Sequence, residues 1–342
     1  MIRILQIIGI LISITGCNSK QAELQKLWIA KYSVHHPNTE NESISSGQRS
    51  IFRFESDSLR IKKFYFDFLT DESKINVVGY QIKEGMILLN EGDKLDTLQY
   101  EISIDGLSLN YDQENFRKSV YEDLSEYHLA NRESMFFEFL ISSSFEILDS
   151  VRIEFRNDGS LIIPNFDFHL GDNQLWMIDR YEEELFLVVD GFFGFVLHVT
   201  EINSDGFRGI IYGKTNREIV FKKLPQETRF KVNNLIGEWI ELRDENISPP
   251  PTLNEETEYY EREQLLITNS TIRKSSFFRV DTIEWETNRE QDLIIIPNLN
   301  LAKGKEHWKI ISLSEVELII ERVRQIRDVN GIRVERKVYE RK

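Results

Sequence analysis

The sequence contains one cysteine, few prolines and no concentration of basic residues. Because Cys17 is the only cysteine, no disulfide can form within the chain, and each domain depends on packing alone. The seven prolines, and the lack of a low-complexity tract longer than residues 249–251, argue against an extended mucin-like stalk. The formal net charge of −15 disfavours nucleic acid or an anionic lipid surface as a partner.

Familiar catalytic and metal-binding motifs are also missing. Gly209 and Gly213 suggest a phosphate-binding loop, but that loop needs four residues between its glycines, and here there are three. No His-Glu-x-x-His, Gly-x-Ser-x-Gly or EF-hand pattern occurs. His198 is interpreted as a residue of a strand, and the acidic run 182–184 as a solvated turn. We therefore predict no catalytic residue, cofactor or metal ligand, and expect a protein that is not an enzyme.

The longest apolar run is short and lies at the N-terminus. It follows Arg3 and covers residues 4–14, which at about 1.5 Å per residue cannot cross a hydrocarbon core of about 30 Å. A short positive start, an apolar middle and small residues at the end are typical of a secretory signal peptide. We predict that residues 1–16 are this signal.

Ile14-Thr15-Gly16-Cys17 resembles the lipobox of bacterial lipoproteins. The resemblance implies cleavage before Cys17, lipidation of its sulfur and acylation, such as palmitate, of the new N-terminus. Two or more acyl chains make membrane attachment durable. Asn18 stands where aspartate retains many lipoproteins in the inner membrane, so the resemblance implies the outer membrane of a Gram-negative envelope. Residues 17–24 would then form a lipidated tether.

Alternation of apolar and polar residues recurs along the rest of the chain. Residues 98–104 and 150–155 alternate strictly, as half-buried strands do. The dipeptides Asp-Gly at 105, 158 and 205 and Asn-Gly at 330 separate such runs, as in tight hairpins. Together these patterns predict an all-β fold of antiparallel up-and-down meanders or barrels.

One segment has helical spacing instead. Phe116, Val120, Leu124 and Tyr127 follow Asp112, which is a plausible N-cap. We therefore predict one short amphipathic helix near residues 113–130.

The chain has an internal period of about one hundred residues. We predict a β-barrel-like unit at 25–131, a second β unit at 132–228 and a third at 229–342, each opened by an aromatic strand. Residues 135–138 would supply that strand in the middle unit. The middle unit is the poorest match, so it is alternatively the second half of the first domain.

Gly237-Glu238-Trp239 resembles the Gly-x-Trp motif that opens lipocalin-like domains. The first unit keeps Trp28 but has Lys26 in place of the glycine. The resemblance implies small up-and-down barrels that hold one small apolar ligand. Alternatively, Trp28, Trp239 and Trp308 simply fill the barrel floors as core residues.

A short triplet, Asp-Ser/Thr-apolar, occurs at four places and resembles the O-glycosylation consensus of some Gram-negative lineages. The acceptors would be Ser58, Thr97, Ser150 and Thr282. Alternatively, these Asp-Ser and Asp-Thr pairs merely begin strands.

We expect a membrane-anchored envelope lipoprotein that is a non-catalytic binding protein for a small apolar ligand or a polypeptide. The alternative is a structural or interaction module with filled barrels. An enzyme is the third hypothesis.

Overall fold

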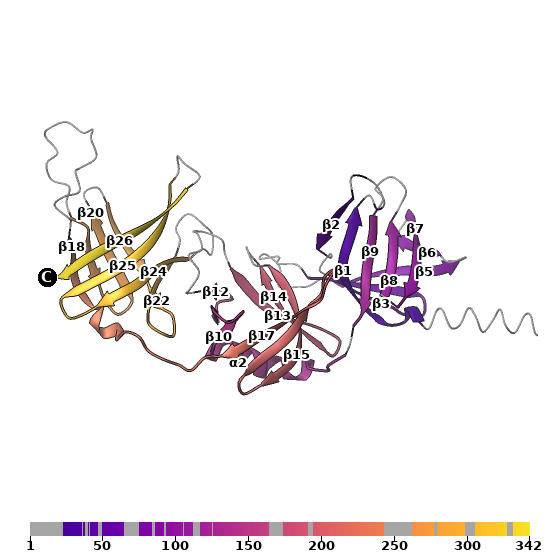
Figure 1. Cartoon of the computed structure of the whole chain (residues 1–342), viewed down its shortest axis with the longest axis horizontal. Helices are drawn as coiled ribbons and strands as arrows, with labels where there is room; N and C mark the ends of the chain where they lie inside the picture. Colours follow the sequence, from indigo (N-terminus) through magenta and orange to yellow (C-terminus); the bar gives the residue numbers. More distant parts are fainter. Residues whose placement is uncertain are drawn as a thin grey trace, which may run out of the picture.

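The fold is described from a computed structural model of the chain. It covers residues 23–342 except 36, 38–39, 41, 47–49, 65–74, 84–85, 92–93, 105, 112–116, 125, 164–173, 191–193, 243–261, 277–278, 298–304 and 327–330. The described part is all-β, with three barrel-like antiparallel sheets, which we call the first, second and third barrels. In Figure 1 they follow one another along the long axis of the molecule, with the C-terminus at the third.

The first barrel contains nine strands. They are β1 (Leu27–His35), β2 (Ser43–Ser46), β3 (Ser50–Phe54), β4 (Ser58–Lys63), β5 (Ile75–Lys83), β6 (Met86–Glu91), β7 (Lys94–Ser103), β8 (Gly106–Tyr111) and β9 (Arg117–Asp123). β2 is a short addition that pairs with the second half of β1, whereas β3 pairs with the first half.

The second barrel begins with a 3₁₀ turn and a helix. Its elements are η1 (Ala130–Arg132), α2 (Glu133–Ser142), β10 (Ser144–Ile147), β11 (Val151–Phe155), β12 (Leu161–Ile162), β13 (Leu175–Tyr181), β14 (Glu184–Asp190), β15 (Phe195–Asn203), β16 (Gly206–Ile211) and β17 (Arg217–Lys223). A single bridge between Ser160 and Leu175 joins its two outer strands, β12 and β13.

The third barrel is preceded by the 3₁₀ turn η2 (Val232–Asn234). Its strands are β18 (Gly237–Leu242), β19 (Gln264–Ile267), β20 (Thr271–Ser276), β21 (Arg279–Glu284), β22 (Glu286–Thr287), β23 (Leu293–Pro297), β24 (Lys305–Leu313), β25 (Glu317–Ile326) and β26 (Gly331–Arg341). The sheet runs from β21 through β18 and β26 to β22.

All three sheets pair their first long strand with their last. β1 pairs with β9, β10 with β17 and β18 with β26, each antiparallel. In the described part the three sheets share no strand. Each of the segments 25–131, 132–228 and 229–342 contains one of them. In the first sheet this pairing closes the ring from β1 to β9, whereas the second sheet keeps the end strands β12 and β13 and the third keeps β21 and β22.

Two hairpin turns depend on glycine. Gly106 has φ of 118° and Gly206 has φ of 151°. A Cβ atom at either position would lie about 2 Å from the carbonyl oxygen of Tyr121 or Phe221 on the next strand. The Asp-Gly hairpins predicted at these positions are therefore present, and the close strand contact explains the glycine. Asp105 and Asn330 lie outside the described residues.

The predicted helix near 113–130 is in the wrong place. Residues 117–123 form β9, which pairs with both β1 and β8. Closure of the first barrel outweighs the helical spacing of the apolar residues there. The ten-residue helix α2 lies instead at residues where an aromatic strand was expected. Its buried residues are Phe136 and Leu140, which lie one helical turn apart. A short apolar run such as residues 135–138 is compatible with either a helix or a strand, which explains the wrong prediction.

Candidate functional site

Trp28 and Trp239 close the floors of the first and third barrels in the same way. Each indole is buried, and each Nε1 donates a hydrogen bond to a carbonyl four residues earlier. The acceptors are Leu24 O at 3.0 Å and Leu235 O at 2.7 Å. Both leucines are fully buried beside their tryptophan. In both barrels a short helical turn thus folds under the sheet and is fixed by the tryptophan.

A cation lies beside each floor tryptophan, but it comes from a different strand. In the third barrel the Arg341 guanidinium lies 4.7 Å from the Trp239 ring centroid, and a Cβ at Gly237 would come within 3.6 Å of it. In the first barrel Lys26 occupies the glycine position. Its Nζ lies 6.0 Å from the Trp28 ring and 2.6 Å from Asp123.

The register relates these two arrangements directly. Asp123 lies opposite Trp28, and Arg341 lies opposite Trp239. The first barrel therefore has the cation just before its first strand and an acid at the end of its last, whereas the third barrel has the cation on its last strand. This exchange explains why Lys26 replaces the expected glycine while the tryptophan is kept.

The third barrel contains a group of buried and half-buried polar side chains, which we call the polar layer: Glu263, Lys274, Arg322, Lys337 and Tyr339. Glu263 Oε1 lies 2.8 Å from Arg322 Nη1 and accepts a 2.6 Å hydrogen bond from Tyr339 Oη. Glu263 Oε2 lies 3.0 Å from Lys274 Nζ and 3.6 Å from Lys337 Nζ. A single carboxylate thus holds three cations.

Trp308 adjoins this polar layer. The Arg322 guanidinium lies 3.8 Å from the centroid of the Trp308 ring. Trp308 Nε1 donates a hydrogen bond to Glu306 Oε1 at 2.6 Å. Trp308 is buried in the same apolar cluster as Trp239, as the core interpretation requires, and it also contacts charged groups.

The ion pairs of the polar layer determine the protonation of Glu263. Burial alone raises the pKa of a carboxyl group. Here the ion pairs with Arg322, Lys274 and Lys337 and the Tyr339 hydrogen bond outweigh that effect, and the pKa of Glu263 falls to about 2. Burial also raises the pKa of the Tyr339 hydroxyl, which stays protonated and can donate to Glu263.

The first and second barrels meet at a buried contact, the first junction. Ile29, Ile51 and Phe64 of the first barrel pack against Phe186 and Val188 of β14. This apolar contact occupies an outer face of β14, since the alternate residues of that strand face the interior of the second barrel.

Lys62 crosses the first junction. It is 2% exposed, and its Nζ lies 2.6 Å from Asp179 Oδ1 and donates to Arg180 O at 2.5 Å. A buried ammonium group is stable only when it is paired in this way. Arg53 and Glu182 form a second ion pair across the same junction, nearer the surface.

A buried histidine lies near the segment that connects the first and second barrels, and it is linked to that segment through Glu184. His198 Nε2 lies 2.8 Å from Glu184 Oε2, and His198 Nδ1 lies 3.1 Å from Tyr212 Oη. The Glu184 carboxylate also accepts the backbone N–H groups of Tyr127 and His128. Burial raises the pKa of Glu184, but the bonds from His198 and the two amides lower it more. The prediction that residues 182–184 form a solvated turn is thus wrong for Glu184, which is buried because the first barrel covers it.

The second and third barrels meet at a junction rich in arginine, the second junction. Arg152 pairs with Glu290, and Arg156 pairs with Glu286. Ile162 packs against Leu293 and Ile295. The second junction thus surrounds a small apolar contact with charged pairs.

Arg289 lies at the centre of the second junction. Its backbone N–H donates to both carboxylate oxygens of Glu154 at 3.2 Å, and its Nη1 lies 3.7 Å from Glu154 Oε2. Nη1 also donates to Ser143 O at 2.9 Å, and Nη2 donates to Ile141 O. Burial lowers the pKa of Arg289 and raises that of Glu154.

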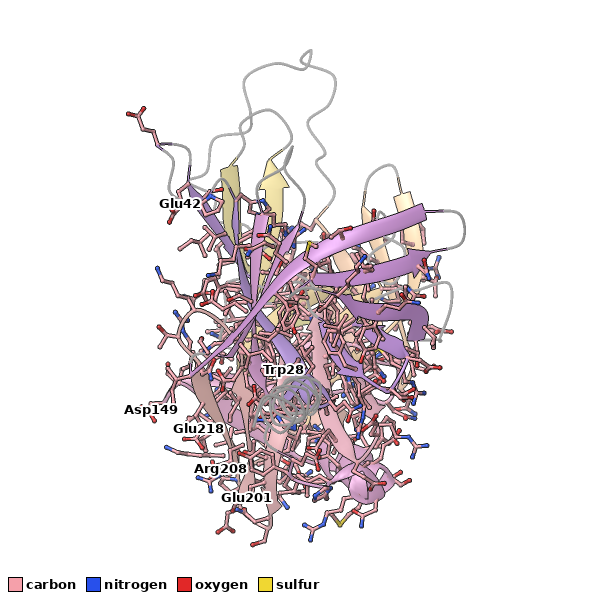
Figure 2. All side chains as sticks on the ribbon, turned by 90° about the vertical axis from the view of Figure 1, so that its right-hand side faces the viewer. Trp28, Glu42, Asp149, Glu201, Arg208 and Glu218 are labelled. Atoms are coloured by element: carbon pink, nitrogen blue, oxygen red, sulfur yellow. The ribbon has the colours of Figure 1, made fainter. Side chains whose placement is uncertain are left out.

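The outer surface of the second barrel also has exposed ion pairs. Figure 2 shows Arg208 near Glu201 and Glu218 on one flank of this barrel. Arg208 lies 2.5 Å from the Glu201 carboxylate and 3.4 Å from that of Glu218. These pairs are about half exposed, so they contribute little to stability.

The four predicted glycosylation acceptors differ in exposure. Thr97 on β7, Ser150 before β11 and Thr282 on β21 are exposed. Ser58 on β4 is half-buried, and its hydroxyl donates to Glu55. Cys17, the predicted lipidation site, lies outside the described residues.

Sequence reasoning missed Glu154, Glu263, Arg289 and Arg322. Only Arg322 left a signal, because it continues the inward alternation of Leu318 and Ile320 along β25. Glu154 is buried and Arg289 is half-buried where the second and third barrels meet, which the alternation of a single strand does not reveal.

Across the described ranges, no three His, Cys, Asp or Glu side chains gather as metal ligands. No helix of the described part is long and apolar enough to cross a membrane. No protein-family model matches the chain. A comparison with curated proteins finds no match either.

Proposed function

We propose that this chain is a lipid-anchored protein of the bacterial envelope that binds a polypeptide partner and carries out no catalysis. The lipobox-like residues before Cys17 support the anchor. The observation that carries the binding function is the docking of three packed barrels through two buried junctions, at Lys62 and at Arg289. Such docking gives three sheet surfaces a fixed relative position, which a protein-binding scaffold needs.

The packing of the barrels favours a polypeptide over a small apolar ligand. The floors of the first and third barrels are occupied by fully buried tryptophan and leucine side chains. The third barrel adds the polar layer, in which Arg322 and Glu263 would have to lose their partners to admit an apolar molecule. We therefore place the partner on the outside of these barrels.

Each barrel exposes an apolar side chain on a strand, and these are suitable contact points. Val77 on β5, Val220 on β17 and Val280 on β21 are all more than 40% exposed. Single exposed valines are common on protein surfaces. These three therefore serve as positions for crosslinking probes and are not by themselves evidence of binding.

The anchor is tested by intact-mass analysis of the native protein from envelope fractions. We expect a chain that starts at Cys17 with a thioether diacylglycerol and an N-acyl group. The variant Cys17→Ser should remain uncleaved and unlipidated. A native protein with a free thiol at Cys17 would overturn the proposed anchor without affecting the binding proposal.

The binding function is tested by photo-crosslinking in living cells. A photoreactive amino acid is placed at Val77, Val220 or Val280, and Ile104, a fully exposed turn residue, serves as the control position. We expect one discrete protein adduct from at least one strand position and none from Ile104. If all three strand positions give no adduct in the anchored protein, the polypeptide proposal is wrong.

A further inference from the structure

Helix α2 occupies one end of the second barrel. Phe136 and Leu140 are completely buried in the same cluster as the inward residues of β14 and β15. The Phe136 ring meets that of Phe207 edge-on at 5.0 Å, and the Phe137 ring stacks on Trp176 at 5.6 Å. In Figure 1, α2 lies at the lower end of this barrel, beside β10 and β17.

The interior behind α2 is aromatic and uncharged. It is lined by four phenylalanines that contact one another: Phe145, Phe155, Phe207 and Phe221. The buried carboxylates of this barrel, Glu154 and Glu184, neighbour inward-facing residues on their strands and therefore face outward. The second barrel therefore differs from the third, whose interior contains the polar layer, and its chemistry suits an apolar guest.

The ends of the helix are held less well than its apolar face. It is ten residues long, and its N-cap residue, Arg132, makes no side-chain cap hydrogen bond. An isolated helix of this length is marginal in water, so its stability depends on the contacts of its buried face and on its ends. Phe136 and Leu140 anchor that face, and the partly buried Phe137, Phe139 and Ile141 pack against the same cluster.

The third barrel completes the C-terminal end of α2. The last carbonyls of a helix lack partners within the helix, and an arginine can satisfy them and complement the negative end of the helix dipole. Arg289 does this from the segment between β22 and β23, through Ile141 O and Ser143 O. Its guanidinium is held in place by Glu154 of β11, a wall strand of the second barrel.

We propose that α2 is a movable plug of the second barrel, kept closed by the third barrel through Arg289. When the segment that carries Arg289 moves away, the last turn of α2 loses its partners and the plug loosens. The phenylalanine-lined interior then becomes accessible to a small uncharged apolar molecule. This inference goes beyond the proposed function, since it needs neither the lipid anchor nor a polypeptide partner.

Hydrogen–deuterium exchange of the full mature chain tests the plug. Arg289→Ala removes the bonds to Ile141 O and Ser143 O, and we expect the amides of residues 136–143 to exchange about tenfold faster or more, the change expected when a hydrogen bond from a charged donor is lost. Amides of β14 should keep their protection, which shows that the barrel stays folded. Arg156→Ala is the matched control, because it removes a pair of the second junction, Arg156–Glu286, that does not touch α2. We expect less than about a twofold change there.

The outcomes separate the plug from ordinary loosening of the junction. If Arg289→Ala and Arg156→Ala change the exchange of residues 136–143 equally, or if neither changes it, the proposal is overturned. If Arg289→Ala does not fold, Arg289→Lys replaces it. Lysine keeps the positive charge but cannot donate to both carbonyls from two nitrogens, so it should give an intermediate exchange rate. An exchange rate for Arg289→Lys equal to that of the wild type would overturn the role of Arg289.

Uptake of N-phenyl-1-naphthylamine, an uncharged apolar fluorophore, tests access to the interior. We expect Arg289→Ala to bind more of the probe than either the wild type or Arg156→Ala at equal protein concentration. Faster exchange of α2 without any gain in probe fluorescence would overturn the inference that opening admits an apolar guest.

Discussion

The first and third barrels share their floors but differ in the polar groups they bury. Both use a leucine carbonyl and a tryptophan N–H, through Trp28 and Trp239, to fix a helical turn under the sheet. The first barrel buries a pair of hydroxyl groups, on Ser33 and Ser119, which are 2.9 Å apart. The third buries ion pairs centred on Glu263.

This comparison separates what the fold requires from what varies between barrels. The floor is kept because a closed meander needs one end filled by large apolar side chains, and its loss would leave a cavity. A buried polar group must be satisfied, but hydroxyl groups do so at a low desolvation cost and charged groups at a high one. We therefore expect the two barrels to respond alike to floor substitutions and differently to changes in their polar groups.

The largest effect should come from the floor. Trp28→Ala and Trp239→Ala should each lower the stability of their own barrel by about 3–5 kcal/mol, the range for large buried aromatics. Urea-dependent pulsed hydrogen exchange reports each barrel separately, through peptides of β1 and β18. A loss below about 1 kcal/mol in either barrel would show that the two floors are not equivalent.

The next effect should be confined to the third barrel. Glu263→Gln removes the charge that Arg322, Lys274 and Lys337 share, and breaking such a buried pair costs about 3–5 kcal/mol. The matched control is Glu55→Gln in the first barrel, whose partner Arg60 is exposed and whose loss should cost no more than about 1 kcal/mol. The same pulsed exchange measures both. Equal losses of stability from Glu263→Gln and Glu55→Gln would contradict the expected difference between the two barrels.

The pH dependence of the third barrel follows from the same carboxylate. Its folded pKa of about 2 lies below the ordinary value of 4.5, so it contributes stability that is complete above about pH 4.5 and is lost as the pH falls toward 2. Between about pH 5 and about pH 3 the third barrel should lose stability in the wild type, and this loss should be smaller in Glu263→Gln. Exchange of β19 and β26 peptides at both pH values checks this. A slope unchanged by the substitution would remove Glu263 as its source.

The sequence was sufficient to predict the all-β meanders but not the contacts between barrels. Alternation within a strand locates inward residues, so the barrels and the hairpins at Gly106 and Gly206 could be read directly. The helix was misplaced, because the spacing of Val120 and Leu124 fits a helix until β9 is known to pair with β1. Glu184 is buried beside the segment that joins the first two barrels, and Arg289 is half-buried at the second junction; no local pattern encodes either contact.

A smaller effect should follow from giving the third floor the first barrel's residue. Gly237 has φ of 149°, and a side chain there would face the Arg341 guanidinium. Gly237→Lys should therefore cost about 1–3 kcal/mol, through backbone strain and repulsion between two cations. Adding Arg341→Asp restores the charge pattern of Lys26 and Asp123 but not the backbone, so it should recover only part of the loss. Full recovery would mean that charge alone separates the two floors.

The smallest effect should come from the buried hydroxyl groups of the first barrel. Ser33→Ala removes the partner of Ser119 and an acceptor of the Arg117 guanidinium, and the loss should be about 1–2 kcal/mol, the net value of one or two hydrogen bonds. In a double-mutant cycle, Ser33→Ala with Ser119→Ala should cost less than the sum of the two single changes, because the second substitution removes the group that the first left unpaired. Pulsed exchange of β1 and β9 peptides measures the coupling. Additive losses would mean that the two hydroxyl groups act independently. The first barrel would then lack even a weak equivalent of the energetic coupling expected among the charged groups around Glu263.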